Sequence, residues 1–330
     1  MSQAKRVLVT GAGGFIGRWS VPALLGTGYE VHAVLSGRAS RDLPKELRGA
    51  KIHFADLLDD SSVDALMSEA RPTHLLHFAW IATPGLYWQS AENFRWMAAS
   101  EHLLRRFGAC GGSRVVMAGS CAEYDWSRVE VCDEYLSPLA DGGTAPLSPY
   151  AACKIGLQRT LGEVGHREHL STAWGRIFFQ FGPHEHPDRL VPFVICNLLQ
   201  GREAPCSHGK QIRSFLHVAD VGAAFAAVLD SELEGPVNIG SGERVALADL
   251  VERIGRQIGR PDLLRLGARP APPHEPPVLV PEVRRLLDDA RWRPRLTLNE
   301  ALSDAIAWWR RTLAAGTGRG LSEYSAPPLP

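Results

Sequence analysis

Residues Lys5 to Gly17 read KRVLVT-GAGGFIG, a short apolar run that leads directly into a glycine-rich turn. The run is rich in β-branched residues and predicts a strand, and residues 18–25 have the pattern of a helix. Strand, glycine turn and helix in this order are the context that a dinucleotide phosphate site requires. Glycine lets the main chain approach a pyrophosphate, and the start of the helix offers free N–H groups. The alternative is a glycine turn that binds nothing. We predict cofactor contacts at Gly11, Gly14, Phe15, Ile16 and Gly17.

The composition is that of a globular chain with substantial cores. The 330 residues are 45% hydrophobic and 22% charged, and the formal net charge is zero. This balance gives no electrostatic attraction to nucleic acid or to an anionic membrane. The start of the chain does not read as a signal peptide, so we expect a cytoplasmic protein. None of the six cysteines forms a Cys-x-x-Cys pair, which predicts reduced thiols and no metal site.

Strand patterns alternate with helix patterns as far as residue 179. This alternation predicts an α/β fold with a doubly wound parallel sheet. Shorter helices, turns and proline-rich stretches follow, which predicts a smaller mixed lobe. The expected strands are residues 5–10, 30–35, 51–54, 74–78, 114–117 and 171–179.

The end of the second strand decides the cofactor. An acidic residue there would hold a ribose 2′-hydroxyl, whereas an arginine accommodates a 2′-phosphate. Residues 36–41 read SGRASR, and no acidic residue occurs before Asp42. Arg38 and Arg41 therefore favour NADP, although NAD stays possible if they are solvated loop charges.

The ends of the next two strands supply further candidates for the cofactor site. Asp56, followed by Leu57, either reaches the adenine or caps a turn. Phe78 and Ala79 end the fourth strand, where small residues would let the cofactor pass close to the main chain. His77 in the same strand is interpreted as a core histidine.

A second stretch, Ser148 to Lys154 (SPYAACK), carries an acid/base pair. Ser148 can cap a helix, and proline suits its first turn. Tyr150 and Lys154 then lie four residues apart on one helix face. A positive charge beside a phenol lowers the pKa of the phenol, which makes it a usable acid or base. Taken alone, such a pair can equally be a solvated helix face. Ser120, at the end of the fifth strand, would point into the crevice where ligands bind in such sheets.

With the three glycines, Ser120, Tyr150 and Lys154 in this order, the chain resembles the extended short-chain dehydrogenase/reductases. Within them it is similar to the nucleotide-sugar epimerases, dehydratases and ketoreductases. The supporting motifs are Asn93, Phe181-Gly182-Pro183, residues 213–220 (RSFLHVAD) and residues 238–242 (NIGSG).

The resemblance implies roles and a division of the chain. It makes Tyr150 the acid/base at a sugar oxygen, Lys154 the partner that lowers its pKa and holds the nicotinamide ribose, and Ser120 a donor to the reacting oxygen. Asn93 is assigned to the cofactor side. A Rossmann domain would comprise residues 1–182 and about 214–232, and a substrate lobe residues 183–213 and 233–313, with a disordered tail at 314–330.

The substrate side departs from the family pattern. Dehydratases of this group carry Asp-Glu directly after the strand-end hydroxyl, where this chain has Cys121-Ala122. Glu123 is one position too far along, although it could be a displaced substitute. Phe179 replaces an Asn that touches the substrate phosphates, and Arg213 would clamp the diphosphate. The other substrate candidates are Trp80, Asn197 and His184, which is either an acid in epimerisation or an ordinary loop histidine.

Three functions follow from this comparison. The leading expectation is NADPH-dependent reduction of a 4-keto group on a nucleotide-diphospho-deoxysugar, with Tyr150 as proton donor. The alternative is an NAD(P)-dependent nucleotide-sugar 4-epimerase, which uses the same residues. A non-catalytic regulatory protein that binds the cofactor is a minor alternative. The family also implies a homodimer formed through the helix after Asn93 and the helix that carries Tyr150.

Overall fold

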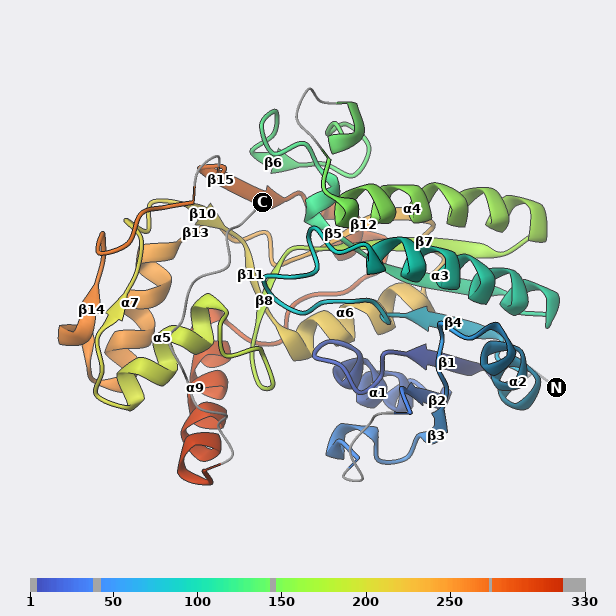
Figure 1. Ribbon diagram of the computed structural model, residues 1–330, viewed down its shortest axis with the longest axis horizontal. Helices are drawn as coiled ribbons and strands as arrows, with labels where there is room; N and C mark the ends of the chain where they lie inside the picture. The colour runs from blue at the N-terminus through green and yellow to red at the C-terminus, as the bar shows by residue number, and fades with distance from the viewer. Residues whose placement is uncertain (1–4, 38–42, 143–146, 273–274, 317–330) are drawn as a thin grey trace.

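A seven-stranded parallel sheet forms the centre of the larger lobe in the computed structural model, which describes residues 5–37, 43–142, 147–272 and 275–316 (Figure 1). The strand order is β12-β7-β5-β4-β1-β2-β3, and every neighbouring pair is parallel. The order reverses between β1 and β4, and ligands bind at such a switch point in open α/β sheets. The strands are β1 (Arg6–Thr10), β2 (Glu30–Leu35), β3 (Lys51–Phe54), β4 (His74–His77), β5 (Arg114–Ser120), β7 (Ser171–Ile177) and β12 (Gly235–Ile239).

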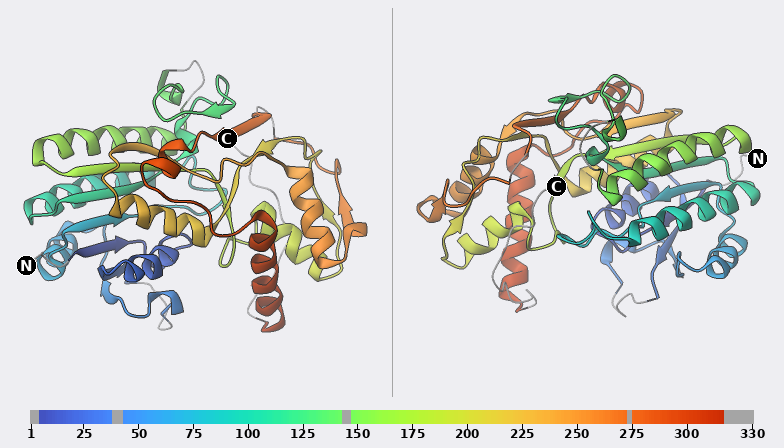
Figure 2. Two further views of the ribbon diagram at one scale, coloured as in Figure 1. Left: turned by 180° about the vertical axis from the view of Figure 1, so that it is seen from behind. Right: turned by 45° about the horizontal axis from the view of Figure 1, so that its top comes forward.

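Helices cover both faces of this sheet, which confirms the predicted doubly wound fold (Figure 2). Val7 and Val9 of β1 pack on the side of α1 and α6, whereas Leu8 packs on the side of α2, α3 and α4. Because both faces are buried, the three central residues of the strand are all apolar rather than alternating with polar residues. The helices are α1 (Gly17–Gly26), α2 (Asp60–Ala70), α3 (Glu92–Ala109), α4 (Pro149–Glu168) and α6 (Val218–Asp230).

The smaller lobe lies at one end of the large sheet (Figure 1). Its helices α5 (Leu190–Leu199), α7 (Leu247–Ile258) and α9 (Leu298–Ala314) share one apolar core. A four-stranded sheet in the order β13-β10-β15-β6 lies beside them. Its strands are β6 (Val131–Cys132), β10 (Ile212–Arg213), β13 (Val245–Ala246) and β15 (Val278–Pro281). The remaining elements are β8 (Phe179–Phe181), β9 (Ala204–Pro205), β11 (Phe215–His217), β14 (Leu264–Arg265), α8 (Arg284–Asp288), η1 (Lys45–Leu47), η2 (Cys121–Glu123), η3 (Ala140–Gly142) and η4 (Pro261–Leu263).

The predicted division of the chain needs correction at two places. Strand β12, expected in the substrate lobe, pairs with β7 over all five of its residues and completes the large sheet. Strand β6, expected in the first domain, pairs with β15 of the small sheet. Helix α9 ends at Ala314, the first residue of the predicted tail, and residues 317–330 of that tail lie outside the described part. Short strands carry too little pattern to reveal their partners, so the sequence could not assign β6 and β12.

None of the helices in the described ranges combines the length and the apolar character that a membrane span needs.

Candidate active site

The glycine turn between β1 and α1 fits a dinucleotide. Gly11 has a φ of +65°, and a side-chain carbon added to it would lie 2.9 Å from the main-chain nitrogen of Ala79. A side-chain carbon at Gly17 would meet the carbonyl of Gly11, lying 2.9 Å from its carbon atom. The Gly14 N–H closes the turn on the Gly11 carbonyl at 2.9 Å. Helix α1 has no side-chain cap, so its first N–H groups can receive an anion. The predicted residues Phe15 and Ile16 are half-buried at this helix start.

Arg18 is a residue at this turn that the sequence reading missed. Its guanidinium donates to the carbonyls of Gly13 (2.6 Å) and Gly14 (3.0 Å). It therefore holds the turn through its carbonyl groups and uses none of its N–H groups. A basic residue directly after the third glycine was the available signal.

The other predicted cofactor residues divide into two groups. Ala79 lies against Gly11, and Phe78 packs on Phe225 with ring centroids 4.8 Å apart. Asp56 accepts from the Leu58 N–H at 3.0 Å, so its carboxylate holds its own turn. Leu57 is a buried core residue. Arg38 and Arg41, the two residues that favour NADP, lie outside the described residues.

Helix α4 begins as predicted and presents the acid/base pair. The Ser148 hydroxyl accepts from the Ala151 N–H at 3.2 Å, and Pro149 occupies the first turn. Lys154 is buried, and its ammonium donates to the Ala118 carbonyl of β5 at 2.9 Å. The ammonium also lies 3.8 Å from the Trp80 ring. Burial lowers the pKa of Lys154 to about 7, although the charge of Glu123 opposes this effect.

Asn93 holds the Trp80 ring, which lies against the Lys154 ammonium. Its side-chain oxygen accepts from the Trp80 indole at 2.8 Å, and its nitrogen donates to the carbonyls of Tyr87 (2.6 Å) and Ser90 (2.8 Å). Asn93 is fully buried, so its amide is used within the protein. It supports the ring beneath Lys154, and the predicted cofactor contact of Asn93 stays a prediction.

Ser120 ends β5 beside Tyr150. A hydrogen bond between the two side chains lowers the pKa of Tyr150, but burial outweighs it and raises that pKa above the ordinary value. The predicted lowering by Lys154 is therefore not seen, because desolvation of the phenol dominates. The Lys154 ammonium lies 5.9 Å from the centre of the Tyr150 ring.

Aromatic rings form a wall around Tyr150. The ring of Tyr87 lies 4.8 Å and that of Trp88 5.3 Å from the Tyr150 ring, both edge to face. Trp126 extends the wall at 6.1 Å from Trp88. An aromatic wall beside the acid/base suits the apolar face of a sugar ring, because such faces pack on flat apolar surfaces.

The predicted substrate residues do not all meet. Cys121 and Ala122 are buried directly behind Ser120, and burial raises the pKa of the Cys121 thiol to about 12. Phe179 lies 5.4 Å beneath the Arg213 guanidinium. Arg213 is buried and ion-paired with Glu275 at 2.8 Å, so its charge is already balanced within the protein.

His184 and Asn197 have other contacts. The His184 ring packs on Trp308 at 4.8 Å and lies 3.9 Å from Glu46. Its backbone is left-handed, with a φ of +70°, which turns the side chain in a direction that the sequence could not reveal. Asn197 donates to the Phe193 carbonyl and accepts from Arg202 at the end of α5. These contacts favour structural roles over the predicted roles in the substrate site.

Glu123 is not a displaced catalytic acid. It is fully buried, and both carboxylate oxygens are occupied by protein donors. Among the residues that the structure describes, no group of three or more His, Cys, Asp or Glu side chains is placed to hold a metal.

Comparison with known proteins agrees with this geometry. Residues 7–240 match the model of the NAD dependent epimerase/dehydratase family. A dTDP-glucose 4,6-dehydratase of Streptomyces niveus is 29% identical, and the alignment covers 92% of this chain and 93% of that protein. A UDP-glucose 4-epimerase of Bacillus subtilis is 25% identical, with 92% and 96% covered.

Solved structures give the same result. A Thermus thermophilus UDP-glucose 4-epimerase in complex with NAD is similar with a TM-score of 0.78 and 26% identity, covering 92% of this chain and 99% of that chain. MoeE5 in complex with UDP-glucuronic acid and NAD has a TM-score of 0.75 and 27% identity, with 93% and 99% covered. With the family model matched over more than half of its length, the chain belongs to the NAD dependent epimerase/dehydratase family.

Proposed function

We propose that this protein carries out redox chemistry at C4 of a nucleotide-diphospho-sugar, and that its leading reaction is NADPH-dependent reduction of a 4-keto group. One observation carries the proposal: Ser120, Tyr150 and Lys154 meet at the end of β5. In the described part of this strand end, no second acid is free. Cys121 and Ala122 occupy the two positions after Ser120, and the Glu123 carboxylate is engaged. Elimination of water needs an additional acid and base, so this site suits a single proton transfer.

The chain's own residues then have defined tasks. The nicotinamide, when bound, supplies the hydride for the keto carbon. Tyr150 donates the proton to the keto oxygen, and the Ser120 hydroxyl stabilises negative charge that develops on that oxygen. Lys154, whose buried ammonium is held by the Ala118 carbonyl, supplies positive charge on the same face of α4 as Tyr150. The aromatic wall of Tyr87, Trp88 and Trp126 orients the sugar ring.

NADPH is favoured by the end of β2. The strand ends at Leu35, and Ser36 and Gly37 follow where an acidic residue would bind the ribose of NAD. Arg38 and Arg41, which follow in the sequence, are residue types that bind a 2′-phosphate. We expect a lower Kd for NADPH than for NADH.

A 4-epimerase is the second candidate. It is favoured by the UDP-glucose 4-epimerases among the relatives and by the NAD present in the solved neighbours. Tyr150 would first accept a proton from the C4 hydroxyl and later return it. Copurifying NAD and redox-neutral turnover would identify this reaction.

The test combines cofactor binding with turnover. Calorimetric titration with NADPH and NADH fixes the cofactor, and 4-keto nucleotide sugars are then assayed for NADPH oxidation. We expect Tyr150→Phe to bind NADPH normally and to lower kcat about a hundredfold, the size of a lost general acid. Equal turnover by parent and variant would contradict the proposal. Interconversion of UDP-sugars without net NADPH oxidation would replace it by the epimerase.

A further inference from the structure

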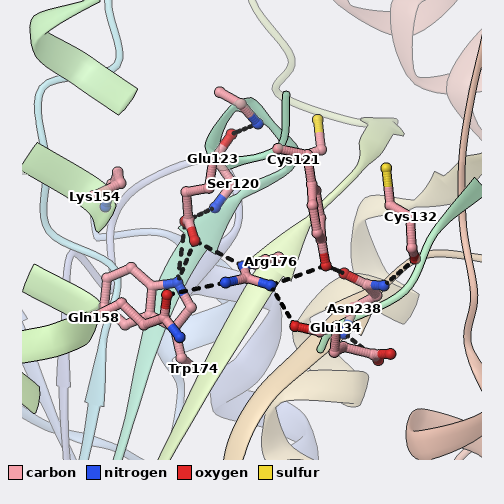
Figure 3. A network of polar contacts seen from close by, with 12 residues as sticks. Ser120, Cys121, Glu123, Cys132, Glu134, Lys154, Gln158, Trp174, Arg176 and Asn238 are labelled. Carbon is pink, nitrogen blue, oxygen red and sulfur yellow. Dashed lines mark hydrogen bonds and ion pairs between the residues drawn. The ribbon is translucent and has the colours of Figure 1, made fainter. Parts of the chain in front are cut away.

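A buried polar network lies behind the end of β5 (Figure 3). At its centre, the Glu123 carboxylate pairs with the Arg176 guanidinium at 2.8 Å, and both side chains are almost completely buried. Glu123 also accepts from the Ser120 N–H at 2.7 Å and from the Trp174 indole at 3.0 Å. A buried carboxylate with three kinds of donor is held in one position. The main chain of Ser120 is therefore fixed by a charged side chain.

Hydrogen bonds connect the Glu123–Arg176 pair to helix α4 and to the smaller lobe. Arg176 donates to the Gln158 side chain of α4 at 2.9 Å, one turn after Lys154. It also donates to the Tyr124 hydroxyl at 3.0 Å, and this hydroxyl donates to Asn238 at 2.7 Å. The Asn238 amide continues to the carbonyls of Cys132 (2.7 Å) and Glu282 (3.0 Å), next to strands β6 and β15.

The position of Glu123 depends on space left by Gly119. A side-chain carbon at this position would meet the Trp174 indole nitrogen and lie 2.5 Å from a Glu123 oxygen. The carboxylate therefore lies directly against the main chain of β5. Lys154 contacts the same strand through the Ala118 carbonyl, and its ammonium is 5.9 Å from the Trp174 ring. The Trp174 side chain thus contacts both charged groups.

Glu123 is also the source of negative charge for Lys154. The described titratable groups that face Lys154 are Glu123 from η2, Cys153 and Tyr150 from α4, and His77 from β4. Burial raises the pKa of Cys153 and of Tyr150, and it lowers the pKa of His77 to about 3, so these three groups are neutral at pH 7. Of the four, the carboxylate that pairs with Arg176 alone is charged.

We propose that Glu123 and Arg176 are positioning residues for the reaction: their ion pair fixes the Ser120 main chain, and the Glu123 carboxylate places negative charge against the Trp174 side chain that the Lys154 ammonium also contacts, which favours the charged form of Lys154. The part of this inference that concerns catalysis rests on the proposed function. Loss of the carboxylate charge would lower the pKa of Lys154 further, because the largest effect that opposes burial is then removed.

Glu123→Gln tests the proposal because it removes the charge of the side chain with little change in its shape. We expect the alkaline limb of the pH–kcat profile to move down by about one pH unit, the effect of one buried charge removed nearby. The value of kcat at pH 8 should fall about tenfold while KM for the nucleotide sugar stays within about twofold, because no substrate contact is removed. The same pH shift should appear in an NMR titration of the Lys154 side chain, which requires no substrate.

Glu134→Gln is the matched control. Glu134 is a second buried carboxylate of the network, and it accepts from the Asn238 N–H at 2.9 Å, away from Ser120. In Glu134→Gln, Lys154 should titrate at the same pH as in the parent protein. An unchanged Lys154 titration in Glu123→Gln would overturn the proposal, as would an equal shift in Glu134→Gln.

Two further measures keep the test decisive. Glu123→Gln leaves Arg176 buried without its ion-pair partner, which can prevent folding. In that case Glu123→Gln/Arg176→Gln removes both charges. Because the lost positive charge partly offsets the lost negative charge, the Lys154 titration should move down by less than in Glu123→Gln, and the absence of any downward shift would overturn the proposal. If the parent protein turns over no ketosugar, the proposed function fails, whereas the NMR titration still decides whether Glu123 sets the charge of Lys154.

Discussion

At the scale of single residues, Glu185 shows how burial changes an ordinary carboxyl group. It follows His184 in the loop before α5, is almost completely buried, and has one carboxylate oxygen without a hydrogen-bond partner among the described residues. Burial raises its pKa to about 8, although the charge of Arg189 opposes the shift. Arg189 in turn hydrogen-bonds Tyr87, which packs on Tyr150. Glu185 is therefore connected to the acid/base tyrosine through two intervening residues, Arg189 and Tyr87.

This pKa gives a stability prediction with a definite sign. Between the ordinary carboxyl pKa of 4.5 and about 8, the folded protein binds a proton that the unfolded chain has lost, so stability falls as pH rises. Glu185→Gln should raise the free energy of unfolding by about 2 kcal/mol at pH 8 and much less at pH 5. Urea titrations at the two pH values measure this. Glu163→Gln, on an exposed position of α4, should show no such difference.

At the scale of elements, the junction of β1 and α1 depends on contacts that admit no side chain. The main chain of Gly17 lies against the Gly11 carbonyl, and that of Gly11 lies against Ala79 at the end of β4. Two strands and one helix therefore approach each other at the switch point of the sheet. The phosphate site is a product of this packing rather than of any single side chain.

Gly17→Ala should open this junction. The added methyl group collides with the Gly11 carbonyl, so we expect NADPH to bind at least about tenfold more weakly, or roughly 1.4 kcal/mol. Gly26→Ala, at the other end of α1, meets no atom within 4 Å and should leave binding unchanged. Calorimetric titration of both variants compares them directly. Equal affinity in the two would mean that the dinucleotide binds elsewhere.

At the scale of the whole molecule, the two lobes are joined through side chains as well as through the chain. Strand β6 belongs to the small sheet although it lies between β5 and α4 in sequence. Asn238 of β12 binds the carbonyls of Cys132 and Glu282 on that side. The lobe that would receive the sugar is thus attached to β12, an edge strand of the same sheet in which β5 carries Ser120.

The expected homodimer belongs to the same scale. Helices α3 and α4 lie side by side on one face, with Phe94 of α3 57% exposed (Figure 1). We expect sedimentation velocity to give a dimer and Phe94→Asp to shift it towards monomer, because the charge would be buried without a partner. Leu136→Asp changes an 85% exposed leucine on another element and should leave the dimer intact. A monomeric parent protein would refute the prediction.

The fold and the centre of the site were predictable because their signals are local. Three glycines after a strand, and Tyr150 one helical turn before Lys154, need no knowledge of distant residues. The partners of Glu123 were not predictable, since Arg176 is 53 positions away and meets it only after β5 and β7 pair. The direction of His184 depends on a left-handed backbone conformation that a sequence pattern does not specify.

Gly119 restricts how this site could change during evolution. A methyl group at position 119 would occupy the space of the Trp174 indole and the Glu123 carboxylate. Positions 119 and 123 therefore cannot vary independently. A lineage that placed a side chain at 119 would first have to lose the carboxylate at 123, and Arg176 would then be left with an uncompensated charge. Each single step is therefore unfavourable, so Gly119, Glu123 and Arg176 could change only together.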